Sequence, residues 1–255
     1  MIDGTTYRYD RWLDVVFTES CILDVPLNRT QTDRPVDLCL EITTSCNFAC
    51  QNCFSNSERG ARGRDLAIDR ALDVIKAHQN QIIRLCITGG EPLMHPDIEA
   101  VLEAPSQLKE CGCVLTTNGS MRQDLDELIT ANQWLTAVSL HGRKDAHEAY
   151  TRSDSFNLTT RRIEALARRA LVHIYTVVHD GLSGDDVEWL FRFRDQTRTQ
   201  FLRFMVPRAH GRFQPLRNEA LLTCIKERLD ARSGLKLGPS LTRFLAVGGA
   251  LRDSH

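Results

Sequence analysis

Three cysteines close together in the chain are the first candidates for chemistry. Cys46, Cys50 and Cys53 fall within eight residues, directly after a run at residues 36–42 that is apolar enough for a buried strand. A closed zinc site or a four-cysteine cluster needs a fourth Cys or His, and none follows within the next twenty residues. Three thiolates on a four-iron cluster leave one iron open, where a cofactor can bind and be activated. The spacing therefore predicts a catalytic iron–sulfur site.

This Cys-x3-Cys-x2-Cys spacing after a first strand resembles the radical S-adenosylmethionine (SAM) superfamily. The resemblance implies that Cys46, Cys50 and Cys53 bind three irons of a [4Fe-4S] cluster, while the amino and carboxylate groups of S-adenosyl-L-methionine chelate the fourth. It also implies an enzyme that reductively cleaves SAM to a 5'-deoxyadenosyl radical, which abstracts a substrate hydrogen. The superfamily has an aromatic residue before the last cysteine, whereas this chain has Asn52 there and Phe54 just after it.

A second motif supports the same resemblance. Gly89-Gly90-Glu91-Pro92 follows the next expected strand and resembles the motif that holds the amino group of SAM. An ammonium group needs carbonyl oxygens and a carboxylate, and glycines let backbone oxygens approach closely. The resemblance further implies SAM contacts at later strand ends: Asn118, Ser139, Arg152 and the backbone of Met205, Val206 and Pro207.

The fourth strand end suggests a branch of the superfamily. Ser139-Leu140-His141-Gly142, followed by His147, Arg152 and Ser155-Phe156, resembles the peptide-maturase (SPASM/twitch-type) branch, with His141 where Asp is usual. The auxiliary-cluster cysteines of that branch are missing from residues 237–255. A peptide substrate is therefore expected, with an anionic small metabolite as the alternative. A second alternative, from a different functional class, is a non-catalytic iron-sulfur or zinc-binding protein. A one-electron donor such as flavodoxin or ferredoxin is the implied partner.

Alternating segments predict the fold. Six strands are expected, each followed by an amphipathic helix, at residues 36–42, 82–88, 113–117, 135–140, 171–178 and 201–206. This pattern predicts an α/β fold, a partial (β/α)6 TIM-like barrel, with chemistry at the carboxyl ends of the strands. The predicted organisation is an N-terminal extension at 1–35, the barrel at 36–214, and a C-terminal helix with a short tail at 215–255.

Composition excludes several other classes. The 255 residues are 42% hydrophobic and 25% charged, as expected for a soluble globular domain. A net charge of -1 argues against nucleic-acid and membrane-surface binding. The chain has no apolar run of 18 residues and no signal-peptide pattern at residues 1–10, so a cytoplasmic protein with reduced thiols is expected.

Further expectations concern single residues. His141, His179 and His210 lie at expected strand ends and are candidates for proton transfer, although histidine is also a common structural side chain. Asp65 is expected to cap the first helix, and Cys111 and Cys113 to point to opposite faces of a strand. Seven cations are expected to rim the barrel mouth and attract an anion, or else to point into solvent or pair with Glu58, Asp145 and Glu148. They are Arg59, Arg62, Arg64, Arg143, Lys144, Arg208 and Arg212.

Overall fold

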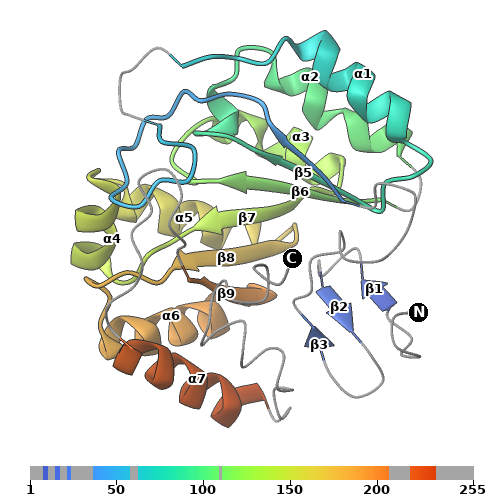
Figure 1. Ribbon diagram of the computed structural model, residues 1–255. Helices are drawn as coiled ribbons and strands as arrows, with labels where there is room; N and C mark the ends of the chain where they lie inside the picture. The colour runs from blue at the N-terminus through green and yellow to red at the C-terminus, as the bar shows by residue number, and fades with distance from the viewer. Residues whose placement is uncertain are drawn as a thin grey trace, which may run out of the picture.

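The computed structural model describes residues 8–10, 15–17, 22–23, 37–57, 63–108, 111–206 and 219–233. Its main feature is a parallel sheet in which six strands follow one another in chain order (Figure 1). The strands are β4 (Asp37–Glu41), β5 (Arg84–Thr88), β6 (Gly112–Thr117), β7 (Leu135–Ser139), β8 (Val172–Val177) and β9 (Phe201–Met205). Three short segments form a separate antiparallel sheet: β1 (Arg8–Asp10), β2 (Val15–Phe17) and β3 (Ile22–Leu23).

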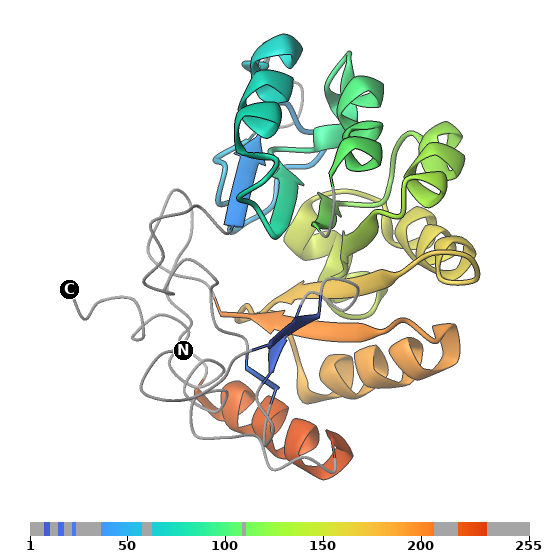
Figure 2. The ribbon, with the colours of Figure 1, turned by 90° about the vertical axis from the view of Figure 1, so that its right-hand side faces the viewer.

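Helices cover one side of the curved parallel sheet (Figure 2). They are α1 (Ile68–His78), α2 (Ile98–Leu102), α3 (Asp126–Ala131), α4 (Lys144–Thr151), α5 (Phe156–Leu166), α6 (Gly184–Thr197) and α7 (Glu219–Ser233). Short 3-10 helices lie at Pro92–Met94, Ala104–Gln107 and Gln123–Leu125. This arrangement confirms the α/β prediction of a partial barrel built from six parallel strands. Among the described residues, no helix is both long and apolar enough to cross a membrane.

Alternating side chains give the sheet two different faces. On the helix-facing side, one apolar cluster covers β4–β6 and includes Leu85, Ile87 and Leu115. Another covers β7–β9 and includes Ile174, Leu202 and Phe204. Because side chains alternate along a strand, the intervening residues point into the concave side of the sheet, here called the lumen face.

The lumen face is much more polar than the helix-facing side. The strand register places Cys39 beside Cys86 and Tyr175 beside Arg203. Arg203 donates a hydrogen bond to the Tyr175 hydroxyl over 2.9 Å, and Arg84 pairs with Asp37 at 3.0 Å. His173 also lies on this face, fully buried, and neither ring nitrogen has a hydrogen-bond partner. Polar side chains inside a barrel can orient a bound ligand through hydrogen bonds.

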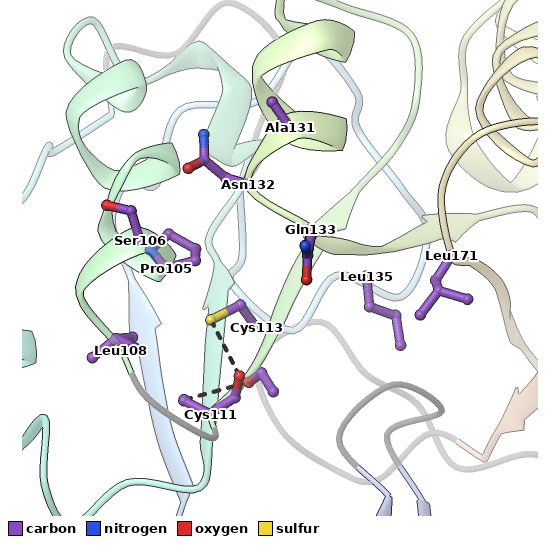
Figure 3. A pocket seen from close by; sticks show the side chains of 11 residues that line it. Pro105, Ser106, Leu108, Cys111, Cys113, Ala131, Asn132, Gln133, Leu135 and Leu171 are labelled. Carbon is purple, nitrogen blue, oxygen red and sulfur yellow. Dashed lines mark hydrogen bonds between the residues drawn. The ribbon is translucent and has the colours of Figure 1, made fainter.

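Two local expectations are wrong. Asp65 does not cap α1, which begins at Ile68 after Ala67; instead its carboxylate accepts a hydrogen bond from the Thr43 hydroxyl and ties the end of β4 to this segment. Cys111 and Cys113 do not point to opposite faces. Both pack against the helix-facing cluster and line the same cavity of about 280 Å³ (Figure 3), because residues two apart in an extended chain share a face.

Candidate active site

The loop that carries Cys46, Cys50 and Cys53, here called the cysteine loop, is held in place by the end of helix α4. It leaves β4 at the carboxyl edge of the sheet and lies beside α4 (Figure 1). The backbone N–H groups of Ala49 and Gln51 donate to the carbonyls of Thr151 and Tyr150 over 3.2 and 2.9 Å. The Tyr150 hydroxyl donates to the Asn52 carbonyl over 2.8 Å. The last turn of a helix has carbonyls without intrahelical partners, and here they orient the loop that carries the three thiols.

Two of the thiols accept hydrogen bonds from the loop backbone. The N–H of Phe48 donates to the Cys46 sulfur over 3.4 Å, and the N–H of Ser57 donates to the Cys53 sulfur over 3.3 Å. Such bonds stabilise thiolate ligands and tune iron–sulfur clusters. Burial raises the pKa of Cys46 to about 11, so its ligation must overcome desolvation of the thiolate.

The donor set suits a cluster better than a single ion. Across the described part of the chain, no three His, Cys, Asp or Glu side chains converge as ligands of one metal ion. Three thiols on one anchored loop, two of them with hydrogen-bonded sulfurs, fit a cluster in which each thiolate takes a different iron. The ligand assignment of Cys46, Cys50 and Cys53 remains the prediction made from their spacing.

Glu91 lies in the turn after β5 and is fully buried. One carboxylate oxygen accepts hydrogen bonds from the Leu93 N–H (3.1 Å) and the Thr117 hydroxyl (2.7 Å), and the other accepts from the Asn118 N–H (2.7 Å). Burial raises the pKa of this carboxyl, while the three donors oppose that rise. Its oxygens are therefore largely occupied by the protein, and its visible role is to tie the turn after β5 to the end of β6.

Gly89 and Gly90 permit close packing of two backbones. A Cβ at Gly90 would lie 2.3 Å from the Ser45 carbonyl oxygen, and one at Gly89 would lie 2.4 Å from that of Thr43. The Gly90 N–H donates to the Thr43 carbonyl over 2.7 Å, and the Glu91 N–H donates to the Ser45 carbonyl over 2.8 Å. The glycines thus let the turn after β5 lie directly against the chain that enters the cysteine loop.

An amide pair joins the same loop to the end of β6. The Asn118 side-chain nitrogen donates to the Asn47 side-chain oxygen over 2.7 Å, and the Asn47 nitrogen donates to the Ser120 hydroxyl over 2.8 Å. A hydrogen bond from Asn118 also lowers the pKa of Cys46. Asn118, predicted to touch SAM, therefore contacts the cysteine loop itself.

The remaining predicted SAM contacts are spread over several elements. Ser139 ends β7 in register with Tyr175, on the lumen face. Met205 ends β9, Val206 follows it, and Pro207 lies outside the described residues. Arg152 is exposed directly after α4, next to the carbonyls that hold the cysteine loop, and has a left-handed backbone. Pro92 begins the 3-10 helix after Glu91 and is buried.

The candidate histidines have clear packing roles. His141 is buried, accepts a hydrogen bond from the Val177 N–H over 3.1 Å, and packs 4.3 Å from the Tyr150 ring. His147 accepts from the His141 N–H (3.2 Å) and lies 3.1 Å from the Ser155 hydroxyl. His179 packs 4.4 Å from the Tyr150 ring. Burial lowers the pKa of all three, so the structure presents neutral rings; His210 lies outside the described residues.

The structure describes three of the seven cations that were predicted to rim the barrel mouth. Arg143 forms an ion pair with Asp186 at 2.8 Å and lies 3.9 Å from Asp185. Its partners among the described residues are therefore these two carboxylates rather than Asp145 or Glu148. Arg64 and Lys144 are exposed. The other four cations and Glu58 lie outside the described residues: Arg59, Arg62, Arg208 and Arg212.

Sequence reasoning missed several residues that build this site. Asn47, Thr117 and Tyr150 supply contacts that hold the cysteine loop and Glu91. The only sequence signal for Asn47 and Thr117 is their position beside recognised motif residues. Tyr150 gives none, because its contact with the loop joins residues 98 apart.

Comparisons with known proteins agree with this geometry. The radical SAM superfamily domain matches residues 40–194. Mycofactocin maturase MftC of Mycobacterium tuberculosis is 27% identical over 139 residues, 53% of this chain and 35% of that protein. GTP 3',8-cyclase of Campylobacter jejuni subsp. doylei is 25% identical over 209 residues, 78% of this chain and 65% of that protein.

A solved structure shares the fold. Streptococcus suis SuiB bound to S-adenosylmethionine superposes with a TM-score of 0.68 at 17% identity, covering 80% of this chain and 49% of that one. This chain thus spans between about a third and two thirds of the length of these relatives. The domain match covers more than half of the chain and includes the cysteine loop and the turn at Gly89–Glu91. The chain belongs to the radical SAM superfamily.

Proposed function

We propose that this chain is a radical SAM enzyme that holds one [4Fe-4S] cluster at Cys46, Cys50 and Cys53, with SAM beside it. The observation that carries the proposal is the direct packing of the cysteine loop on the Gly89–Glu91 turn, through the Gly90 and Glu91 N–H groups. When bound, the cluster supplies the electron that cleaves SAM to methionine and a 5'-deoxyadenosyl radical, which abstracts a hydrogen from the substrate. A flavodoxin or ferredoxin is the proposed electron source.

The protein's own part is to position groups and to exclude water. The α4 carbonyls and the Asn47–Asn118 pair fix the loop, while Glu91 fixes the neighbouring turn. The backbone oxygens around Gly89 and Gly90 would accept from the SAM ammonium, and Ser139 would hydrogen-bond SAM at the next strand end. A dry, preorganised site protects a reactive radical from side reactions.

A peptide is the proposed substrate. Two observations support it: the maturase-like segment from Ser139 to Phe156, and the likeness to MftC and to SuiB, which has also been crystallised bound to its precursor peptide SuiA. Within that segment, His147 contacts Ser155 and the N–H of His141, so these residues brace the loop after β7. The support therefore comes from shared architecture rather than from peptide-contacting side chains.

An anionic small metabolite is the second candidate. The GTP 3',8-cyclase match covers more of this chain than the maturase match does. The lumen face also carries Arg203 in the middle of β9, where its guanidinium donates to the Tyr175 hydroxyl and lies over the Tyr175 ring. A guanidinium with a fixed orientation suits a carboxylate or a phosphate.

One experiment distinguishes a radical SAM enzyme, whatever its substrate, from a non-catalytic metal-binding protein. The chain is reconstituted anaerobically with iron and sulfide, and iron, sulfide and zinc are counted. SAM and dithionite are then added, and 5'-deoxyadenosine is measured. We expect one four-iron cluster per chain and slow SAM cleavage, both lost in Cys50→Ala and retained in Cys224→Ala. Bound zinc without iron, or a full cluster that never cleaves SAM, would contradict the proposal.

A further inference from the structure

Two thiols outside the cysteine loop lie side by side on the lumen face. Cys39 of β4 is the register partner of Cys86 of β5. Both point away from the helices, because their neighbours Leu38, Leu40, Leu85 and Ile87 pack into the helix-facing cluster. Adjacent strands are about 4.8 Å apart, which lies within the Cα separation that a disulfide can bridge.

The two thiols differ in exposure. Cys39 is exposed on the edge strand of the sheet, whereas Cys86 is buried, packs with Val114 and Tyr175, and lies 3.9 Å from the Thr116 hydroxyl. The interaction between the two thiols lowers the pKa of Cys39 and, together with burial, raises that of Cys86. An accessible thiol beside a buried one has the arrangement of an attacking and a resolving cysteine.

We propose that Cys39 and Cys86 form a redox-active dithiol on the lumen face, in which Cys39 reacts with low-molecular-weight disulfides and Cys86 then closes an intramolecular disulfide. This site is separate from Cys46, Cys50 and Cys53, and it does not depend on the proposed radical chemistry.

The exchange balances with glutathione disulfide as the oxidant. The Cys39 thiolate attacks one sulfur of glutathione disulfide, forms a mixed disulfide and releases one glutathione thiolate. The Cys86 thiolate then attacks the Cys39 sulfur and releases the second glutathione. Two protein thiols lose two electrons and two protons, and one glutathione disulfide becomes two glutathione thiols. The new bond joins β4, which leads into the cysteine loop, to β5, which leads into the Gly89–Glu91 turn.

The test maps disulfides in the cluster-loaded protein. The protein is equilibrated anaerobically with mixtures of glutathione and glutathione disulfide, free thiols are blocked with N-ethylmaleimide, and peptides are analysed by mass spectrometry. Cleavage after Glu41 separates Cys39 from the cluster cysteines, and cleavage after Arg84 releases the Cys86 peptide. We expect a Cys39–Cys86 linked peptide. Cys111 and Cys113 are the internal control: they are also close together but do not face each other across two strands, and we expect them to stay reduced.

Two variants test the order of attack. In Cys86→Ala the mixed disulfide on Cys39 has no resolving thiol, so the glutathione adduct should accumulate about tenfold over wild type. In Cys39→Ala neither the adduct nor the linked peptide should form. The proposal is overturned if wild-type protein yields no more Cys39–Cys86 link than Cys111–Cys113 link, or if glutathione attaches first to Cys86. Cys224→Ala, altered on α7, should behave as wild type.

Discussion

The carboxylate of Glu91 and the backbone N–H of Asn118 lie 2.7 Å apart, and this contact joins the turn after β5 to the end of β6. The same carboxylate binds Thr117 and Leu93, so one buried side chain fixes the geometry of two neighbouring strand ends. A residue predicted from its motif to bind SAM is thus also a structural tie.

Glu91→Gln should destabilise the fold. The amide retains one acceptor oxygen but turns a donor toward the Asn118 N–H or the Thr117 hydroxyl, at a cost of about 1–3 kcal/mol. Urea unfolding of wild type and variant measures the loss. Glu103→Gln, at an exposed position after α2, is the matched control and should change the unfolding free energy by less than about 0.5 kcal/mol. Equal stability of the two variants would show that the buried hydrogen bonds contribute little.

Gly90→Ala should disrupt the cysteine loop. The added Cβ would lie 2.3 Å from the Ser45 carbonyl oxygen, so one of two packed backbones must move, at a cost of about 2 kcal/mol or more. The measurements are the thermal midpoint and the iron content after reconstitution. Gly184→Ala, at the start of α6, is the control because its nearest contact would be an ordinary 3.5 Å. Full iron loading and an unchanged midpoint in Gly90→Ala would contradict the close packing.

A double-mutant cycle should reveal coupling between Asn47 and Asn118. Their side chains share a 2.7 Å hydrogen bond, and a partly buried bond of this kind contributes about 1 kcal/mol. Asn47→Ala, Asn118→Ala and the double variant are compared by urea unfolding. We expect the two single losses to sum to more than the double loss. Strict additivity would mean that the two amides act independently.

Asp186 should stabilise the fold in a pH-dependent way. Hydrogen bonds from Arg143 and Ser183 lower the pKa of Asp186, although burial opposes them. Its contribution is therefore complete above the unfolded pKa of about 3.9 and is lost as the pH falls through the folded value. Asp186→Asn removes the charge beside Arg143 and replaces one acceptor oxygen by a donor, and it should cost about 1–2 kcal/mol at pH 7.

The pH profile and a neighbour provide the check on Asp186. The difference in unfolding free energy between wild type and Asp186→Asn should shrink as the pH is lowered from 5 toward 2. Asp185→Asn, whose side chain is 86% exposed, should show a much smaller loss at neutral pH. A difference for Asp186→Asn that stays constant over this range would rule out an ionic contribution.

His173 should lower stability in mild acid. Burial, followed by the nearby Arg203 and Arg84, lowers its pKa from 6.5 to about 3. Below pH 6.5 the His173 ring binds a proton in the unfolded chain but stays neutral in the folded chain. The free energy of unfolding therefore falls as the pH drops. At pH 5 the loss is about 2 kcal/mol relative to pH 7.5. His173→Leu should remove this part of the pH dependence in urea unfolding; an unchanged profile would contradict the assignment.

Sequence patterns located the strands because each is a short apolar run followed by a recognisable turn. All six predicted strands agree with the structure to within two residues at each end. The cysteine loop and the Gly89–Glu91 turn were found because their chemistry depends on local spacing. The Asp65 prediction failed because a tertiary contact with Thr43 outweighed local capping preference.

The side-chain partners that could not be predicted from the sequence are those in long-range contacts. Arg143 pairs with Asp186, 43 positions away, rather than with the nearby Asp145. Tyr150 reaches Asn52 across 98 residues. The close Cys39–Cys86 contact depends on the exact register of β4 and β5, and a shift of one residue would turn one thiol to the other face.

The packing of the Gly89–Glu91 turn on the chain entering the cysteine loop has a thermodynamic consequence. Because the two segments share backbone hydrogen bonds, a ligand that orders one also orders the other. Loading the three cysteines should therefore raise the affinity for SAM, and reciprocity requires SAM to strengthen cluster retention by the same factor. The rate at which a chelator strips iron would then depend on SAM concentration, even in protein that turns over no substrate.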